Sequence, residues 1–467
     1  MQMFDIIAGQ SVYDEKEIIG TLRISKNLLA FQKNYLQRLI LNRIAFLHST
    51  KKTDVLFLLK QAEILKNKGL YPQHLKTLKK IKEVAHEFDM HGSLLEVAGI
   101  EHSLAWKDQR HDDAAKAIEE KKKIIERLTL EAEYHSLANE IITKLARLGN
   151  ENKPEVIKQL KKLVKNPLMK VEKNAVTFRC KNYLYHTLSL YYSVAGSPKK
   201  QYLYAKKNAD LFSSNPEKAK HFTMIHVFAI HNLVAACNAV KKYDEAKKNL
   251  DILIKSSQLL PSEREKMWAF FTFYDNSFDY YINTGQFKEG VVFADQHMEA
   301  INKHAEKLDA IQNIQLCYLI AKIYFGAANY SKCIEWMNKV RQHEPELRLR
   351  PDLEVNTKLF YIIAHFEKGN SDLLPYLSKS LHRHLRTEKR LYKVETIVLD
   401  FFGKRILKAD SKKEIADELK KLKKELLILA DDTYESAPMK EFDYISWIDS
   451  KLENKSFAEI VKRKALA

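Results

Sequence analysis

The sequence is poor in residues that break helices and in pairs that hold disulfides or metals. Its 467 residues include only 12 glycines and 10 prolines, which argues against a sheet-rich fold with many tight turns. The four cysteines lie far apart and form no CxxC pair, so we expect neither a disulfide framework nor a zinc site. They read instead as small buried thiols in a reducing compartment. These are Cys180, Cys237, Cys317 and Cys333.

Long apolar runs are also missing. The most apolar stretch runs from Val227 to Val240, contains His231, Asn232 and Asn238, and is too short to span a bilayer. The N-terminal residues Met-Gln-Met-Phe-Asp lack the basic and apolar regions of a secretory signal. We therefore expect a cytoplasmic protein that does not bind membranes.

The motifs of common catalytic and cofactor sites do not occur. The chain has no glycine-rich phosphate loop, no GxSxG elbow and no GxGxxG turn. His86 and His91 are five residues apart, whereas two metal ligands on one face of a helix need a spacing of four. The sequence thus predicts a protein that is not an enzyme and that uses no metal or cofactor.

Positive charge exceeds negative charge. The chain has 78 lysines and arginines against 60 acidic residues, a formal net charge of +18. Such an excess favours contact with nucleic acid, because cations near phosphates release counterions. The two signs are interleaved, however, as in the run from Glu119 to Lys123. Solvated helix faces are the first interpretation and a nucleic-acid surface is the alternative.

What the sequence does contain is a recurring turn signal, in which a small residue precedes an aromatic or turn residue by two positions. Counted at the second residue of each pair, successive signals differ by 40, 40, 47, 45, 44, 43 and 41 residues. This period predicts stacked helical hairpins. The pairs are Gly69 with Tyr71, Gly149 with Glu151, Gly196 with Pro198, Lys241 with Tyr243, Gly285 with Phe287, Ala328 with Tyr330 and Gly369 with Ser371, and a weaker signal lies near His111.

Two of the predicted hairpins repeat the same pattern of residues, at offsets of 4, 6, 3, 4 and 3. The first series is Leu233, Cys237, Tyr243, Ala246, Leu250 and Leu253, and the second is Ile320, Tyr324, Tyr330, Cys333, Met337 and Val340. Ala246 and Cys333 provide a small residue where the two helices cross, and Gly290 occupies the matching place in the hairpin between them. These residues resemble the tetratricopeptide-like superfamily.

The resemblance implies an all-α fold, a right-handed superhelical solenoid of antiparallel helix pairs with helical caps at both ends. We expect an N-terminal helical cap over residues 1–53, the repeat array over 54–375 and a C-terminal helical cap over 376–467. The chain departs from the superfamily in its period, which exceeds the usual ~34 residues, and in lacking most of the Trp-Leu-Gly pattern of the first helix. Longer helices are the expected consequence.

Several motifs also resemble an uncharacterised family of bacterial cytoplasmic helical-repeat proteins. They lie at residues 25–27 and 33–36, 178–183, 389–393, 447–452 and 456–459. This second resemblance covers the chain from end to end and implies no activity. Members of that family start further upstream, so we expect the N-terminus here to be shortened.

In tetratricopeptide-like arrays the first helix of each pair lines a concave face that accepts an extended peptide or a helix. Asp275 and Asp279 at such positions favour a basic or aromatic partner. The aromatic residues between Trp268 and Tyr281 provide either an anchor for that partner or core packing. The residues expected to face inward are Tyr183, His186, His231, Asp275, Asp279, Lys322 and Asn356.

The main functional hypothesis is therefore a scaffold or adaptor that binds another protein or a peptide. The alternative is a regulatory protein, of which a ribosome-associated role is a variant, that contacts DNA or RNA through a basic end. That end is either the helix from Lys26 to Arg43 or a C-terminal stretch with Tyr392 available for stacking. The phosphate-contacting residues of that stretch would be Arg383, Arg386, Lys389, Arg390 and Lys393. The sequence predicts no partner identity and no oligomeric state.

Overall fold

The computed structural model describes residues 2–47, 50–148, 154–348, 350–387, 392–409, 411–430, 432, 435 and 437–466. Within these ranges the chain is helical and contains no strand, which confirms the all-α prediction. None of these helices is both long and apolar enough to cross a bilayer. The turn signal at Gly149 and Glu151 lies outside the described residues.

The chain forms two compact units, Met1–Thr129 and Leu130–Ala467. In the first unit, α1 to α3 share a small core around Met3, Ile18 and Leu29, and α4 to α6 share a second core. The helix α7 spans His111–Leu148 and contains the boundary between the units. The helices before it are α1 (Gln2–Gly9), α2 (Glu15–Leu22), α3 (Lys26–Leu47), α4 (Lys51–Asn67), α5 (Tyr71–Glu87) and α6 (His91–Lys107).

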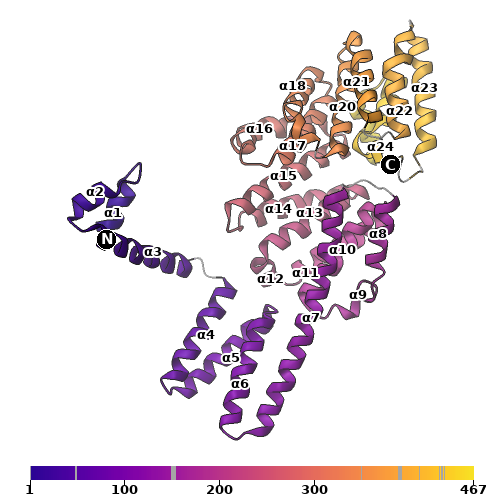
Figure 1. Ribbon diagram of the computed structural model, residues 1–467. Helices are drawn as coiled ribbons and strands as arrows, with labels where there is room; N and C mark the ends of the chain where they lie inside the picture. The colour runs from indigo at the N-terminus through magenta and orange to yellow at the C-terminus, as the bar shows by residue number, and fades with distance from the viewer. Residues whose placement is uncertain are drawn as a thin grey trace. The chain divides into compact units, whose positions relative to one another are not determined.

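The second unit is built largely from helices that pack in adjacent pairs, with α10 on α11, α13 on α14, α15 on α16 and α17 on α18. The pairs also pack on one another, since α11 contacts α13, α13 contacts α15 and α15 contacts α17 (Figure 1). These helices are α8 (Pro154–Val164), α9 (Pro167–Lys170), α10 (Phe178–Val194), α11 (Pro198–Ser213), α12 (Pro216–His221), α13 (Thr223–Ala239), α14 (Tyr243–Ser257), α15 (Glu263–Thr284), α16 (Phe287–Ala305), α17 (Ala310–Gly326) and α18 (Tyr330–Arg341).

The rest of the second unit continues the large core of α15 to α18. Short irregular helical turns connect some of these elements, among them the π-helical turn η3 (Phe401–Arg405). The helices are α19 (Glu344–Leu347), α20 (Pro351–Glu367), α21 (Leu374–Thr387), α22 (Lys393–Asp400), α23 (Lys412–Leu429), α24 (Ala437–Glu441), α25 (Tyr444–Leu452) and α26 (Phe457–Leu466).

The turn signals coincide with residues in the left-handed conformation. Gly285 has φ +70° two residues before the start of α16, and Lys241 and Ala328 have φ values of 60° and 59° two residues before α14 and α18. A left-handed residue after the last turn of a helix lets its amide bond the helix's free carbonyls and redirects the chain. The two-residue spacing of the turn signal therefore corresponds to the distance from the left-handed residue to the first residue of the next helix.

Small residues allow the helices to cross closely. A Cβ atom added to Gly290 of α16 would lie 2.8 Å from Cδ1 of Ile323 and 3.1 Å from Cβ of Tyr281. Ala246 and Cys333, at the matching places in α14 and α18, are fully buried. All four cysteines are free and buried, as the sequence predicts.

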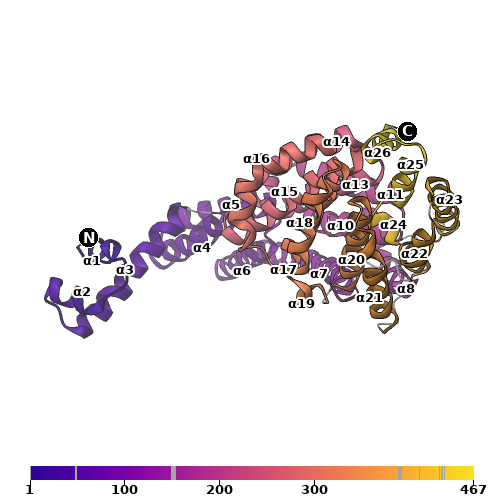
Figure 2. The ribbon, with the colours of Figure 1, turned by 90° about the horizontal axis from the view of Figure 1, so that it is seen from above.

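The C-terminal helices fold back onto the turns of earlier hairpins. The backbone of α26 lies against the α15–α16 turn at Gly285, and Nζ of Lys241, in the α13–α14 turn, donates to the carbonyl oxygen of Lys464 at 2.8 Å. Figure 2 shows α26 beside one end of α14, near the C-terminus. In α25, Nε1 of Trp447 donates to Oε1 of Glu367 at the end of α20, at 2.7 Å. The C-terminal segment formed by α25 and α26 therefore contacts hairpins that are not its neighbours in sequence.

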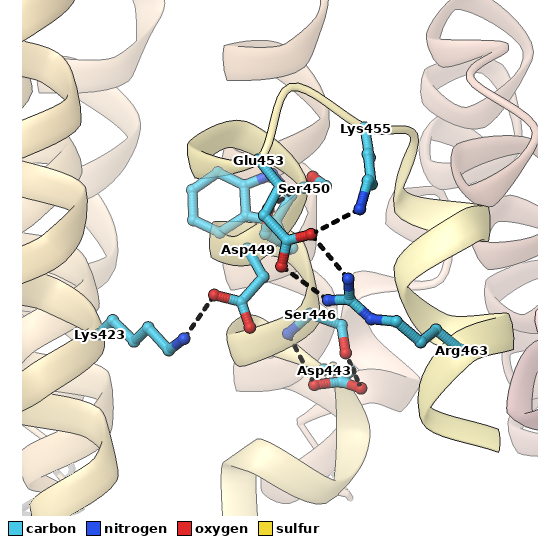
Figure 3. A network of polar contacts seen from close by, with 9 residues as sticks. Lys423, Asp443, Ser446, Asp449, Ser450, Glu453, Lys455 and Arg463 are labelled. Atoms are coloured by element: carbon cyan, nitrogen blue, oxygen red, sulfur yellow. Dashed lines mark hydrogen bonds and ion pairs between the residues drawn. The ribbon is translucent and has the colours of Figure 1, made fainter. Parts of the chain in front are cut away.

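Ion pairs hold α25 and α26 together (Figure 3). Glu453 at the end of α25 accepts hydrogen bonds from both terminal nitrogens of Arg463, at 2.7 and 2.6 Å, and from Lys455. These partners, Arg463 first, lower the pKa of Glu453 to about 2. Lys423 of α23 pairs with Asp449 of α25 at 2.5 Å, so α23 is tied to the same segment.

Candidate functional site

Polar side chains join the first helices of successive hairpins. Nδ2 of Asn232 in α13 lies 3.1 Å from Nδ1 of His186 in α10. One helix further, Nδ2 of Asn276 in α15 lies 2.7 Å from Nδ1 of His231 in α13. Next, Nε2 of Gln315 in α17 donates to Oδ1 of Asp275 in α15 at 2.6 Å. We call this set of six residues the polar ladder.

The two histidines of the polar ladder are neutral at pH 7. Both are half-buried, and burial lowers the pKa of each to about 4, with the nearby His186 adding to the effect on His231. An amide nitrogen only donates, so Nδ1 of each ring accepts and the proton lies on Nε2. Each ring therefore keeps one N–H group as a donor.

The polar ladder ends in a group of charged residues on α15 and α17. Burial, with the neighbouring Asp279 as the second cause, raises the pKa of Asp275 to about 8. Burial likewise raises the pKa of Asp279, to about 6. Nζ of Lys322 lies 4.5 Å from the ring centre of Tyr318 and 3.9 Å from Oε2 of Glu441 in α24. Asp275 is thus a protonated carboxyl at neutral pH beside the ionisable groups of Asp279, Lys322 and Glu441.

The structure places the other two expected inward residues apart from this row. Tyr183 of α10 is half-buried, and its ring lies 5.1 Å from that of His135 in α7. Asn356 of α20 is half-buried, and no hydrogen bond among the described residues joins it to the other six. Of the aromatic residues around α15, Tyr274, Phe278 and Tyr280 belong to the cores, whereas Trp268 is half-buried and packs edge-on against His231.

The predicted basic residues do not form one described cluster. Arg383 and Arg386 are exposed on α21, and Lys393 is exposed at the start of α22. The backbone N–H of Lys393 donates to Oε2 of Glu435 at 2.6 Å. Lys389 and Arg390 lie outside the described residues.

Asn232, Asn276 and Gln315 were not expected at the site from the sequence. A signal for the asparagines does exist, because His231-Asn232 and Asp275-Asn276 are two polar pairs 44 residues apart. That separation equals the one between the turn residues Tyr243 and Phe287. A polar pair that recurs at the distance between hairpins indicates equivalent positions on successive first helices.

The chain matches no protein-family model and no curated protein sequence. Among the described residues, no group of three or more histidine, cysteine, aspartate or glutamate side chains is arranged to hold a metal ion. The polar ladder is therefore interpreted from its own geometry.

Proposed function

We propose that the chain is a scaffold or adaptor without catalytic activity, and that it binds an extended peptide or a helix of another protein along α10, α13, α15, α17 and α20. In this proposal the hairpins form a tetratricopeptide-like solenoid and the first helices line its concave face. The observation that carries the proposal is the polar ladder, which spans four successive first helices.

The donors and acceptors of the polar ladder suit the backbone of a peptide. Amides provide both donors and acceptors, and each neutral imidazole keeps an N–H group. Polar groups that are already bonded to one another are held in fixed positions, so they lose little further freedom when a ligand binds. Trp268 beside His231 adds an aromatic surface for a side chain of the ligand.

The acidic end of the polar ladder favours a partner with a basic residue. A ligand cation near Asp275 and Asp279 would stabilise their ionised forms and lower both pKa values. Because Asp275 is protonated at neutral pH, binding would release a proton, and the affinity would rise with pH from about 6 to 8. This dependence distinguishes recognition at Asp275 from binding elsewhere on the surface.

A phage-displayed library of random peptides panned on the full chain tests the proposal. We expect enriched peptides to contain lysine or arginine together with aromatic residues. Their affinity should fall at least about tenfold for Asn232→Ala, which removes one rung, and their pH dependence should disappear in Asp275→Asn. Asn302→Ala, an exposed asparagine on the second helix α16, is the matched control and should bind as the original chain does.

Two results would contradict the proposal. One is the absence of any enriched sequence class. The other is a set of peptides whose affinity changes equally in Asn232→Ala and Asn302→Ala, because such peptides would not use the polar ladder.

Nucleic-acid binding through the basic C-terminal stretch is the alternative, and the exposure of Arg383, Arg386 and Lys393 favours it. It predicts retention on DNA or RNA that weakens steeply with salt and partners from the native cell that are lost after nuclease treatment. Charge reversal of the five predicted basic residues should abolish retention; unchanged retention would reject the alternative. Protein partners that persist after nuclease treatment would favour the scaffold.

A further inference from the structure

The positive charge of the chain is concentrated in one segment of the second unit. Residues 156–181 contain seven lysines and one arginine, and Glu172 is their only acidic residue. The segment thus carries a net charge of +7, out of +18 for the whole chain. The interleaving of charges in the run from Glu119 to Lys123 therefore does not extend to this segment.

The helix α8 presents four of these lysines on one face. Their spacings of three and four residues place them in one row along the helix. The backbone N–H of Lys165 donates to the carbonyl oxygen of Lys161 at 3.2 Å, so the last lysine continues the helical turn. The opposite face holds Val156 and Leu160, which are buried in a core with residues of α7 and α10. The row consists of Lys158, Lys161, Lys162 and Lys165, all of them exposed.

The turn after α8 is held in place by contacts with other helices. The hydroxyl of Tyr134 in α7 donates to the carbonyl oxygen of Leu168 in α9 at 2.8 Å. In the short helical turn η1 (Glu172–Asn174), Glu172 accepts from Nζ of Lys207 in α11 at 2.6 Å. The single carboxylate of the segment is therefore neutralised by a residue from outside it. The turn adds two exposed lysines, Lys170 and Lys173.

We call these six lysines the basic face. In the part of the chain that the structure describes, none of their side chains forms a hydrogen bond, an ion pair or a cation–π contact. By contrast, Lys420 and Lys421 of α23 pair with Asp417 and Glu418 on the same helix. Like charges three or four residues apart repel one another and destabilise a helix. A ligand with closely spaced negative charges would relieve this repulsion.

The surroundings of the basic face distinguish between classes of anionic partner. A basic helix that binds a bilayer inserts its apolar face, but the apolar face of α8 is buried in the core. The only exposed large apolar side chains of residues 156–181 are Val171 and Val176, and valine is rare among the residues that dominate protein interfaces. Single-stranded nucleic acid binds by stacking on aromatic rings, but Phe178, the one aromatic residue of the segment, is buried. A nucleic-acid duplex needs neither apolar contact nor stacking.

We propose that the basic face binds the phosphate backbone of double-stranded DNA without sequence preference. The row of lysines on α8 extends over about 10 Å, at 1.5 Å per residue, and B-DNA carries one negative charge per about 1.7 Å of its axis. Several phosphates therefore lie within reach of the row. The major groove of B-DNA, about 12 Å wide, admits an α-helix, whereas the major groove of duplex RNA is too narrow.

Lysine is a compact point charge without the planar fork of N–H groups that arginine offers to a base, so the basic face reads no sequence. None of its residues belongs to the polar ladder. A test of this proposal and a test of the peptide-binding proposal can therefore fail separately.

Fluorescence anisotropy of a labelled DNA duplex of about 20 base pairs, titrated with the full chain at several salt concentrations, tests the proposal. We expect a dissociation constant of about 1–100 μM at physiological salt and a steep loss of affinity as salt rises. Lys158→Gln/Lys161→Gln/Lys162→Gln should weaken binding about tenfold or more and reduce the slope of log affinity against log salt by about 3. Because glutamine and lysine have similar helix propensities, the thermal midpoint should stay unchanged.

The matched control is Lys247→Gln/Lys248→Gln/Lys255→Gln on α14. It removes the same net charge from three other exposed lysines, whose side chains form no hydrogen bond or ion pair within the described ranges. This variant should bind the duplex as the original chain does. A double variant, Lys170→Gln/Lys173→Gln, tests the turn after α8 and should reduce the slope by about 2.

Four results would overturn the proposal. They are the absence of binding to the duplex even at low salt, equal weakening by the two triple variants, tighter binding of duplex RNA than of duplex DNA, and displacement of the duplex by polyglutamate at an equal concentration of charge. The last result would assign the basic face to an acidic protein instead.

Discussion

Gly285 provides the sharpest test of how the C-terminal segment is attached. This residue ends α15 with φ +70°, and a Cβ atom there would lie 2.6 Å from the backbone N of Lys462 and 3.0 Å from the carbonyl oxygen of Ala458. Both atoms belong to α26, so alanine at this position cannot be accommodated by a side-chain rotation. Either the turn or α26 must move.

Gly369 is the matched control, because it follows α20 in the same left-handed conformation, with φ +83°, and an added Cβ atom would have no atom of the described residues within 4 Å. Gly369→Ala should cost only the left-handed conformation, about 1–2 kcal/mol. Gly285→Ala should cost that amount plus about 1–3 kcal/mol for overpacking against a rigid neighbour. The difference between the two variants isolates the contact with α26.

Hydrogen exchange measured by mass spectrometry on peptides covering residues 457–466 is the assay, together with the thermal midpoint of each variant. We expect faster exchange in α26 for Gly285→Ala and unchanged exchange for Gly369→Ala. Equal losses of stability in the two variants, with α26 protected to the same extent in both, would refute the docking of α26 on the α15–α16 turn.

Three further predictions concern packing and pH. Gly326→Ala should lower the free energy of unfolding by about 1–3 kcal/mol, because the added Cβ atom would lie 2.1 Å from the buried ring of Phe287. Gly99→Ala in α6, where the added Cβ atom would lie 4.0 Å from Nζ of Lys121, should raise it by about 0.5–1 kcal/mol. Chemical unfolding measures both changes, and changes of the same sign would contradict this account of the packing. The raised pKa of Asp275, about 8, means that the folded state loses stability as pH rises from about 4 through 8. Asp275→Asn should therefore raise the thermal midpoint more at pH 8.5 than at pH 5. An equal change at both pH values would argue against a protonated carboxyl. The lowered pKa of Glu453, about 2, has the opposite effect, so its contribution to stability is present above about pH 4.3 and is lost as pH falls toward 2. Glu453→Gln should therefore make the thermal midpoint less sensitive to pH between 5.5 and 3. An unchanged slope of thermal midpoint against pH would disprove this prediction.

The sequence carried the information for the local structure. A left-handed residue after a helix is a local requirement, so glycine or a tolerant residue two positions before the next helix predicts the turn. The structure has such residues at Gly69, Gly196, Gly285 and Gly369, and also at Lys241 and Ala328, where no glycine occurs. The turns at Lys241 and Ala328 could be recognised only from the regular distance between successive turn signals.

Contacts between distant segments could not be predicted in the same way. Residue spacing reports which side chains share one helix face, but it does not report which helices are neighbours. Lys322 and Glu441 lie close together although 119 residues separate them. The cavity lined by residues of α18, α19, α20 and α21 likewise requires these four helices to converge.

The C-terminal segment limits how independently the helix pairs of the second unit can unfold. In an array where each hairpin contacts only its neighbours, stability is a sum of local terms and the ends can unfold independently. Here α25 and α26 contact the α13–α14 turn at Lys241, the α15–α16 turn at Gly285 and the end of α20 at Glu367. Releasing this segment would remove contacts from all three hairpins at once, so their unfolding is coupled through it. The same hairpins carry most of the polar ladder, and the spacing of its rungs therefore depends on a segment that is remote in sequence.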